Sequence, residues 1–339
     1  ARFLEIEYIK NEKNMAQLKT TFAGLTLNNP IIISSSGLTN SLAKIQKLEE
    51  AGAGAVVLKS VFEEQINMQA GSMQGYGSPE ADDYLGAYVR SHALNEHITL
   101  IEDVKKHCKI PVIASINCVV DKGDWIEYAT AMADAGASAL ELNIFIQSTD
   151  IHAQARELEL NYAEIVGRVA GAVKIPVSVK LPMRLTNVFA LSSALLGHGA
   201  RGVVFFNRFF EPDVDVERMT FVESSPYSEP TELRNVLRMV AICSAVLPQL
   251  DLSVSTGVHD GEAAVKALLC GAEAVQVCTA IHQKGFEVIA EMNEYIDRWS
   301  ERQGFGSLDE FRGRLNFKND TSAMFQRVQY MKYFPSEAK

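Results

Sequence analysis

The chain has 339 residues, of which 47% are hydrophobic, and this is enough for one large buried core. Its formal net charge of −10 argues against binding to a nucleic-acid backbone, because proteins that do so usually present a basic face. No apolar stretch reaches the roughly 18–20 residues that a membrane span needs, so we expect no membrane partner. The five cysteines form no CxxC pair. We therefore expect reduced thiols, no metal and a cytoplasmic protein.

The N-terminal residues differ in character from the rest of the chain. Residues 1–14 are charged and unlike a secretion signal, and Met15 has the appearance of a natural start. We assign residues 1–15 to an N-terminal extension and residues 16–339 to a single domain. A peripheral arm of the fold is the equal alternative for the extension.

A recurring unit indicates the architecture. Four times a helix-like segment ends in a glycine next to an alanine and runs into a short apolar strand, at Gly52, Gly136, Gly199 and Gly271. We expect each glycine to end its helix in the left-handed conformation.

Eight apolar runs follow one another along the chain, at residues 30–33, 55–57, 110–114, 139–140, 177–179, 202–204, 252–255 and 274–275. They are too uniformly hydrophobic for half-exposed strands, so they predict parallel strands buried on both faces. Alternation with helices predicts a single (β/α)₈ TIM barrel, with an open doubly wound sheet as the alternative. Phe62 to about Thr99 and Asn207 to about Leu233 are long loops after the second and sixth strands, and are candidate lids.

Polar residues collect at the C-terminal ends of these strands, where barrel enzymes place their active sites. They are Ser34, Ser35, Ser36, Gly37, Lys59, Ser60, Asn117, Asn143, Lys180, Asn207, Ser255, Thr256, Gly257 and Thr279. The set contains no carboxylate and no histidine, which argues against a metal site and against hydrolysis by paired carboxylates. It suits a bound anion that carries electron-rich ring atoms.

Two of these residues, Lys59 and Lys180, end otherwise apolar strands, where a buried ammonium is costly without negative charge nearby. Together with the amides at other strand ends they indicate cofactor ligands. A side chain that reaches past the rim into water is the structural alternative. Either lysine could instead form a Schiff base, so a barrel aldolase is the second class of function.

The loops after the last two strands predict a phosphate site. Residues 255–261 contain Gly257, and residues 277–281 contain Thr279. Glycine exposes backbone N–H groups, and helix starts add partial positive charge, so a phosphate fits there without an arginine. His259 is interpreted as a solvated loop residue.

Five segments carry a family resemblance: Thr21–Pro30, Val57–Val61, Glu141–Asn143, Val179–Pro182 and Ala274–Ile281. Between about Leu18 and Phe317 the chain resembles the dihydroorotate dehydrogenase family, especially its soluble branch. The last segment is the most specific, although the family usually has glycine where Cys278 stands. The resemblance implies an FMN-dependent dehydrogenase that acts on a CH–CH bond, of the pyrimidine-biosynthesis type.

The resemblance also implies roles for individual residues. We expect cofactor contacts from Ser35, Ser36, Gly37, Lys59, Ser60, Asn117, Asn143, Lys180, Gly257, Val258, Cys278 and Thr279. Asn143, Asn207 and Lys59 are expected to contact the substrate. Lys180 is expected to be catalytic, because a lysine near the N1 and O2 atoms of the flavin stabilises the negative charge of the reduced ring.

Two departures from the family bear on the substrate. The family's loop after the fourth strand reads Asn-x-Ser-Cys-Pro-Asn, and its cysteine, or serine in the membrane branch, removes a proton from dihydroorotate; here Ile146 stands at that position. The soluble branch's substrate loop also has no counterpart, and residues 82–88 occupy that interval. Ser148 is the candidate replacement base, with Tyr84 and Tyr88 as alternatives.

Two further readings of the function stay open for these reasons. The chain could be an FMN oxidoreductase with a different substrate, or a flavin-binding protein without turnover. By resemblance to the soluble branch we expect a small dihydropyrimidine-like substrate, a soluble or protein electron acceptor, and a homodimer.

Overall fold

The computed structural model describes residues 18–62, 94–118, 124–146, 148–208 and 211–318. The predicted extension at residues 1–15 and the candidate bases Tyr84 and Tyr88 lie outside the described residues. Among the described helices, none is both long and apolar enough to cross a bilayer.

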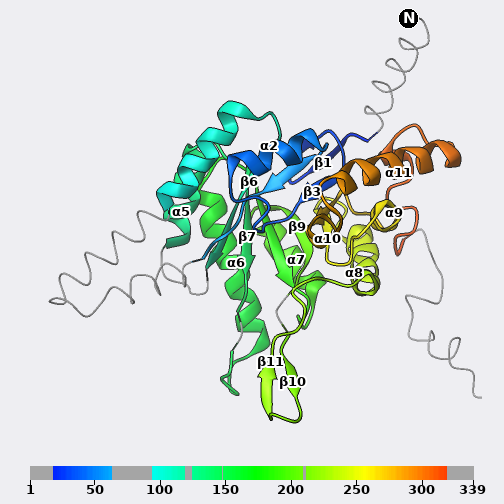
Figure 1. The fold of residues 1–339 in the computed structure, drawn as a ribbon. Helices are drawn as coiled ribbons and strands as arrows, with labels where there is room; N and C mark the ends of the chain where they lie inside the picture. Colours follow the sequence, from blue (N-terminus) through cyan, green and yellow to red (C-terminus); the bar gives the residue numbers. More distant parts are fainter. Residues whose placement is uncertain (1–17, 63–93, 119–123, 147, 209–210, 319–339) are drawn as a thin grey trace, which may run out of the picture.

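Eight parallel strands form a closed ring (Figure 1). In chain order they are β3 (Ile31–Ile33), β4 (Ala55–Val57), β6 (Val112–Cys118), β7 (Ala139–Ile144), β8 (Val177–Pro182), β9 (Ala200–Asn207), β12 (Asp251–Ser255) and β13 (Ala274–Val277). Each strand pairs with the next, and β13 returns to pair with β3. The short β5 (Val61–Phe62) pairs with β6 beyond the end of β4. The predicted barrel is confirmed, and the open sheet is wrong.

Helices surround this barrel (Figure 1). They are a helix over residues 94–107 and α2 (Leu42–Glu50), α5 (Asp124–Asp134), α6 (Ala155–Ala172), α7 (Val188–Gly197), α8 (Leu233–Val246), α9 (Gly261–Leu269), α10 (Thr279–Lys284) and α11 (Glu287–Gln303), with a 3₁₀ turn, η2 (Leu308–Glu310), after them. The predicted left-handed glycines are confirmed, because Gly52, Gly136, Gly199 and Gly271 have φ of +88°, +100°, +102° and +105°. Each of them turns the chain from a helix back toward the sheet.

A hairpin closes the N-terminal end of the barrel. It consists of β1 (Thr20–Phe22) and β2 (Leu25–Leu27), and it was not predicted. Its fully buried Phe22 and Leu27 belong to one cluster with side chains from the barrel wall, namely Ile32, Ala55, Val57, Ile113, Ala139, Val204 and Ala274. Gly202 permits this approach, since a Cβ there would lie 3.0 Å from the Phe22 ring. The N-terminal half of the barrel interior is therefore an apolar plug.

Strand alternation makes the C-terminal half of the interior polar. Side chains two residues apart face the same side of a strand. In β6 the inward series thus passes from Ile113 to Ser115, and in β7 from Ala139 to Glu141 and Asn143. On the other strands Ser178, Lys180, Ser253 and Gln276 continue this layer, and all are buried. The site is built on this polar layer.

The long interval after β9 contains structure of its own. The hairpin of β10 (Asp213–Asp215) and β11 (Thr220–Val222) is followed by a 3₁₀ turn, η1 (Pro230–Glu232), just before α8. The hairpin projects away from the barrel (Figure 1). The other predicted candidate lid falls mostly in residues 63–93, outside the described part of the chain.

Candidate active site

A cavity of about 210 Å³ opens at the C-terminal ends of the strands. Its lining combines predicted site residues with three that the sequence analysis missed, Arg208, Pro226 and Ser228. The predicted residues are Ser34, Ser35, Lys180, Asn207, Ser255, Thr256, Gly257, Val258, Cys278 and Thr279. Gln276, from the segment that carries the family resemblance, lines the cavity as well. The fold therefore brings the ends of β3, β8, β9, β12 and β13 together around one space.

Lys180 lies at the centre of this arrangement. The residue is only 5% exposed, and its Nζ donates to Ser34 Oγ and to Gln276 Oε1, each at 2.9 Å. Burial lowers the pKa of the ammonium, while the charge of Glu141 and the nearby Cys278 act in the opposite direction. Because an ammonium has three donors, these two bonds leave one N–H for a group in the cavity.

Glu141 lies one layer deeper in the barrel and was missed as a site residue. It is fully buried, and its Oε2 accepts a short hydrogen bond from Gln276 Nε2. Burial raises the pKa of this carboxyl, which Lys180 and the Gln276 amide lower in part. The sequence analysis considered strand ends, whereas Glu141 stands in the middle of β7. Its alternation with Asn143 was the signal that could have revealed it.

Asn143 belongs to a cluster of hydroxyl groups beside the lysine. Its Nδ2 donates to Ser60 Oγ at 3.0 Å and to Ser115 Oγ at 3.1 Å, and Ser35 Oγ lies 3.1 Å from Ser60 Oγ. Asn143 Oδ1 is buried and has no hydrogen-bond partner among the described residues. Such an atom is rare in a finished interior and indicates a missing ligand donor.

The remaining predicted contacts from this side lie at the rim. Asn117 ends β6 opposite Asn143 and is half-buried, and Ser36 and Gly37 continue the loop after β3. Lys59 is exposed, as in the structural alternative of a side chain that reaches past the rim into water. Its role as a cofactor or substrate contact stays a prediction.

The predicted phosphate loops meet on the opposite side of the cavity. Thr256 and Gly257 both have φ of +78°, and a Cβ on Gly257 would lie 2.4 Å from the backbone nitrogen of Leu233. Only glycine fits there without moving the start of α8. Gly257 N–H donates to Ser228 Oγ at 3.4 Å, and Ser228 Oγ donates to Thr279 Oγ1 at 3.2 Å. Three separate segments thus direct small polar groups at one point.

His259 corrects an earlier expectation. Instead of being solvated it is only 6% exposed, and its Nε2 lies 3.0 Å from Ser228 Oγ. Burial lowers the pKa of this imidazole, and the neighbouring Lys284 lowers it further. The ring is therefore neutral near pH 7, and it positions the Ser228 hydroxyl. No local sequence signal could reveal this contact, because Ser228 and His259 are 31 residues apart in the sequence.

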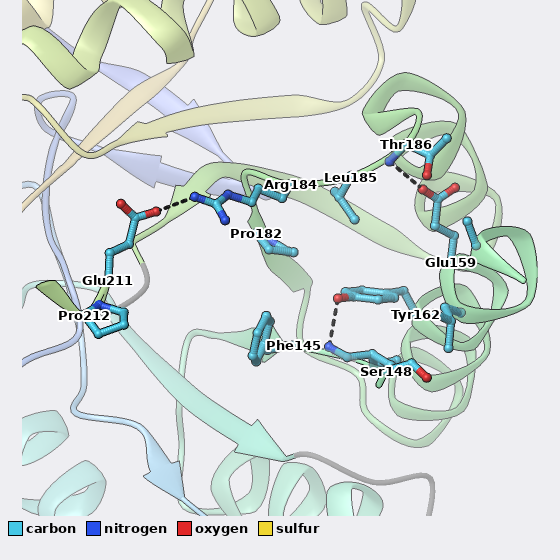
Figure 2. A pocket seen from close by; sticks show the side chains of 13 residues that line it. Phe145, Ser148, Glu159, Tyr162, Pro182, Arg184, Leu185, Thr186, Glu211 and Pro212 are labelled. Carbon is cyan, nitrogen blue, oxygen red and sulfur yellow. Dashed lines mark hydrogen bonds and ion pairs between the residues drawn. The ribbon is translucent and has the colours of Figure 1, made fainter. Parts of the chain in front are cut away.

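Ser148 lies in a second cavity, of about 670 Å³, between the ends of β7 and β8 and helix α6 (Figure 2). This cavity is walled by Phe145, Tyr162 and Leu185, and an ion pair of Arg184 with Glu211 spans 2.7 Å at its exposed edge. Ser148 is itself exposed and accepts from the N–H of Asp150 at 3.1 Å. The structure therefore does not bring Ser148 and Lys180 into the same cavity.

Ile146 borders the same second cavity. Its side chain is half-buried against the helix layer of the core, and its N–H donates to Tyr162 Oη at 3.0 Å (Figure 2). Burial raises the pKa of the Tyr162 hydroxyl. The position that carries the base in the resemblance is thus held by an apolar side chain, and the phenol beside it keeps its proton.

Comparison with known proteins was decisive for the family. The sequence profile described as dihydroorotate dehydrogenase matches residues 17–299. The chain belongs to the dihydroorotate dehydrogenase family. A putative dihydroorotate dehydrogenase A (fumarate) from Aeropyrum pernix is 30% identical over 88% of this chain and 97% of its own length.

Two further relatives of the family show a wider range of names. The catalytic subunit of dihydroorotate dehydrogenase B (NAD(+)) from Methanothermobacter thermautotrophicus is 26% identical over 87% of this chain and 97% of its own length. The NAD-dependent dihydropyrimidine dehydrogenase subunit PreA of Escherichia coli is 25% identical over 88% of this chain and 77% of its own length. These relatives are all dehydrogenases, so the chain is an oxidoreductase of this family and the aldolase alternative loses its support.

Family membership implies a flavin, and the residues present fit one. The Lys180 ammonium and the small-residue loop at Gly257 line one cavity, and the unpartnered Asn143 Oδ1 belongs to the residue that pairs with Lys180 on the neighbouring strand. Within the described residues, no group of three or more histidine, cysteine, aspartate or glutamate side chains could hold a metal ion.

Proposed function

We propose that this chain is an FMN-dependent oxidoreductase that acts on a CH–CH bond of a small cyclic substrate. The observation that carries the proposal is the buried Lys180 ammonium, which faces the cavity between an amide–hydroxyl cluster and the loop at Gly257. A cation at this depth is costly to maintain unless it serves an electron-rich group.

Lys180 would stabilise the negative charge that two-electron reduction brings to the cofactor. When bound, FMN would supply the two-electron hydride chemistry for a CH–CH bond, with an external acceptor to reoxidise it. Asn143 and Asn207, at the ends of β7 and β9, would orient the ring and the substrate through their amides. Ser35, Ser36, Gly37, Ser60 and Asn117 would border the ring, and Lys59 would close the rim.

The phosphate would lie where Gly257, Val258, Cys278 and Thr279 meet. Backbone N–H groups of the two loops and the hydroxyl of Thr279 are suitable donors. Ser228, held by His259, donates to Thr279 Oγ1, which leaves the proton of the Thr279 hydroxyl available for the phosphate. The cavity of 210 Å³ is smaller than the roughly 300–1,000 Å³ of ordinary ligand pockets. The bound FMN would therefore extend across the rim.

The substrate is proposed to differ from dihydroorotate. An isoleucine cannot accept a proton, and Ile146 lines the second cavity, whereas Lys180 lines the first. A relative named as a dihydropyrimidine dehydrogenase subunit supports another dihydropyrimidine-like ring. An enone reduced in the opposite direction is the alternative. With Ser148 in the second cavity, Tyr84 and Tyr88 are the stronger candidates for proton transfer.

The electron acceptor and the assembly complete the proposal. The name of the Methanothermobacter relative, a catalytic subunit, supports a protein acceptor, and a soluble acceptor is the alternative. By resemblance to the soluble branch we propose a homodimer, which sedimentation equilibrium would test. A flavin-binding protein without turnover is the second candidate function, because Ile146, at the position of the base, cannot accept a proton.

The test is purification under gentle conditions, followed by an absorbance spectrum and mass analysis of the supernatant after denaturation. We expect one FMN per chain and anaerobic bleaching by a dihydropyrimidine from a substrate panel. Flavin adenine dinucleotide or no flavin would overturn the cofactor assignment. FMN that no substrate bleaches would indicate a flavin-binding protein without turnover. A substrate adduct on a lysine, trapped by borohydride, would support the aldolase alternative instead.

A further inference from the structure

The polar layer of the barrel contains a chain of hydrogen bonds that joins two opposite charges. Lys180 Nζ donates to Gln276 Oε1 at 2.9 Å, and Gln276 Nε2 donates to Glu141 Oε2. One amide thus bridges β8, β13 and β7 across the interior. Both charged residues are almost fully enclosed, with 5% and 0% exposure.

The orientation of the Gln276 amide fits an ionised pair. Its oxygen faces the ammonium and its nitrogen faces the carboxylate. A flipped amide would oppose donor to donor at Lys180 and acceptor to acceptor at Glu141. Ser34 agrees, since its hydroxyl accepts from Lys180 at 2.9 Å while donating to Gln276 Oε1 at 3.3 Å. The donors therefore run in one direction, from the lysine to the carboxylate.

Glu141 is the one charged group that acts on Lys180 among the described residues. The other titratable neighbour is Cys278, whose thiol stays neutral near pH 8 because burial raises its pKa. On the side of Glu141 the charged neighbour is Lys180. A lysine buried to this degree without a counter-charge loses several pKa units and becomes neutral near physiological pH. The charge of Lys180 thus depends on a carboxylate one layer below it.

We propose that Glu141 is a positioning residue that keeps Lys180 in its ammonium form beneath the bound cofactor. The inference rests on the proposed flavin function, because it assigns Lys180 to the charge of the reduced ring. Glu141 does not line the cavity, and it acts on Lys180 by its charge, with the Gln276 amide between them. Its remaining oxygen, Oε1, is buried without a partner among the described residues, so Gln276 makes the hydrogen bond by which the described part of the chain holds this carboxyl group.

The first test uses sulfite, which binds oxidised flavin and leaves a negative charge on the ring, so its affinity reports the charge of the lysine rather than turnover. The variants are Glu141→Gln, which keeps the hydrogen bond but removes the charge, and Lys180→Met. Glu273→Gln is the matched control. It removes another buried carboxylate with a raised pKa, of about 8, at the N-terminal end of the barrel.

We expect the sulfite Kd of Glu141→Gln, relative to the unmodified protein at the same pH, to rise about tenfold or more near pH 8.5 and to recover near pH 6, where the lysine regains its proton. Lys180→Met should bind sulfite weakly at both pH values, and Glu273→Gln should bind it with the affinity of the unmodified protein. Unchanged or tighter sulfite binding in Glu141→Gln at both pH values would overturn the proposal.

The second test needs no cofactor. In Glu141→Gln a neutral lysine must lose a proton on folding. The unfolded state then binds more protons, and stability rises with pH until the unfolded lysine itself titrates. Relative to the unmodified protein, its unfolding equilibrium constant should fall by up to about tenfold per pH unit between about pH 7.5 and pH 9.5. If the ratio of the two unfolding equilibrium constants did not change with pH over this range, the proposal would be overturned.

If Glu141→Gln does not fold, Glu141→Met removes the same charge with an apolar side chain of similar length and should show the same loss of sulfite affinity near pH 8.5, and unchanged affinity would overturn the inference. Lack of flavin in the unmodified protein would count against the proposed function, while the pH slope of the cofactor-free protein would still decide the role of Glu141.

Discussion

Gly257→Ala is the substitution whose effect the structure defines best, because Gly24 provides a matched control. Both glycines have φ of +78°. An alanine in this left-handed conformation costs about 1–2 kcal/mol. At Gly24 an added Cβ meets nothing within 4 Å, whereas at Gly257 it would lie 2.4 Å from the nitrogen and 2.9 Å from the Cα of Leu233. Overpacking adds about 1–3 kcal/mol. We therefore expect a loss of about 2–5 kcal/mol for Gly257→Ala and about 1–2 kcal/mol for Gly24→Ala.

Urea unfolding of the cofactor-free proteins measures these losses, and titration with FMN measures the second consequence. Displacing Leu233 shifts the loop that we assign to the phosphate, so Gly257→Ala should weaken FMN binding about tenfold or more, while Gly24→Ala should not change it. Equal destabilisation by the two substitutions would refute the contact between Gly257 and Leu233. Unchanged FMN affinity in Gly257→Ala would refute the placement of the phosphate.

Lys180→Met should retain the fold but slow flavin reduction by roughly two orders of magnitude or more in anaerobic stopped flow, since a preorganised charge is lost; a rate equal to that of the unmodified protein would disprove its role. Dihydroorotate should bleach the flavin far below about 1 s⁻¹. Rapid bleaching would show that another residue serves as base, and slow bleaching in Ile146→Cys as well would locate the defect in the substrate loop. Burial raises the pKa of Glu273 to about 8 from its usual 4.5. The folded state therefore binds more protons between these values, and stability should fall as pH rises through that window. Urea unfolding at pH 5 and pH 8 should show this fall in the unmodified protein and a smaller one in Glu273→Gln.

The barrel could be predicted because its signals are local. Buried parallel strands must be apolar along their whole length, and the chain needs left-handed residues such as Gly52 and Gly271 to turn back from each helix. The hairpin of β1 and β2 escaped prediction for the opposite reason. Its strands have three residues each, too few for a period to be visible, and its role depends on the bottom of a barrel formed by the other strands.

The candidate site could be predicted in part. Residues at strand ends, such as Lys180 and Gly257, were found because the fold fixes where strand ends meet. Ser228 was missed because the long loop after β9 brings it to the cavity, and His259 was misjudged because its burial depends on that distant contact. Arg208 was missed although it directly follows Asn207, a predicted residue. Lys59 shows the limit at the strand ends, since it lies two residues beyond the end of β4 and is exposed, whereas Lys180 lies inside β8 and is buried.

The apolar plug at the bottom of the barrel has a consequence for how this fold acquires new substrates. The cluster around Phe22 and Leu27 anchors the strands at their N-terminal ends, far from the loops that choose a ligand. A loop that exchanges a reactive side chain for one like Ile146 therefore leaves that anchor intact. Active-site residues can therefore change in this architecture while the barrel continues to fold, so that a chain can lose the reaction of its relatives and still keep their fold.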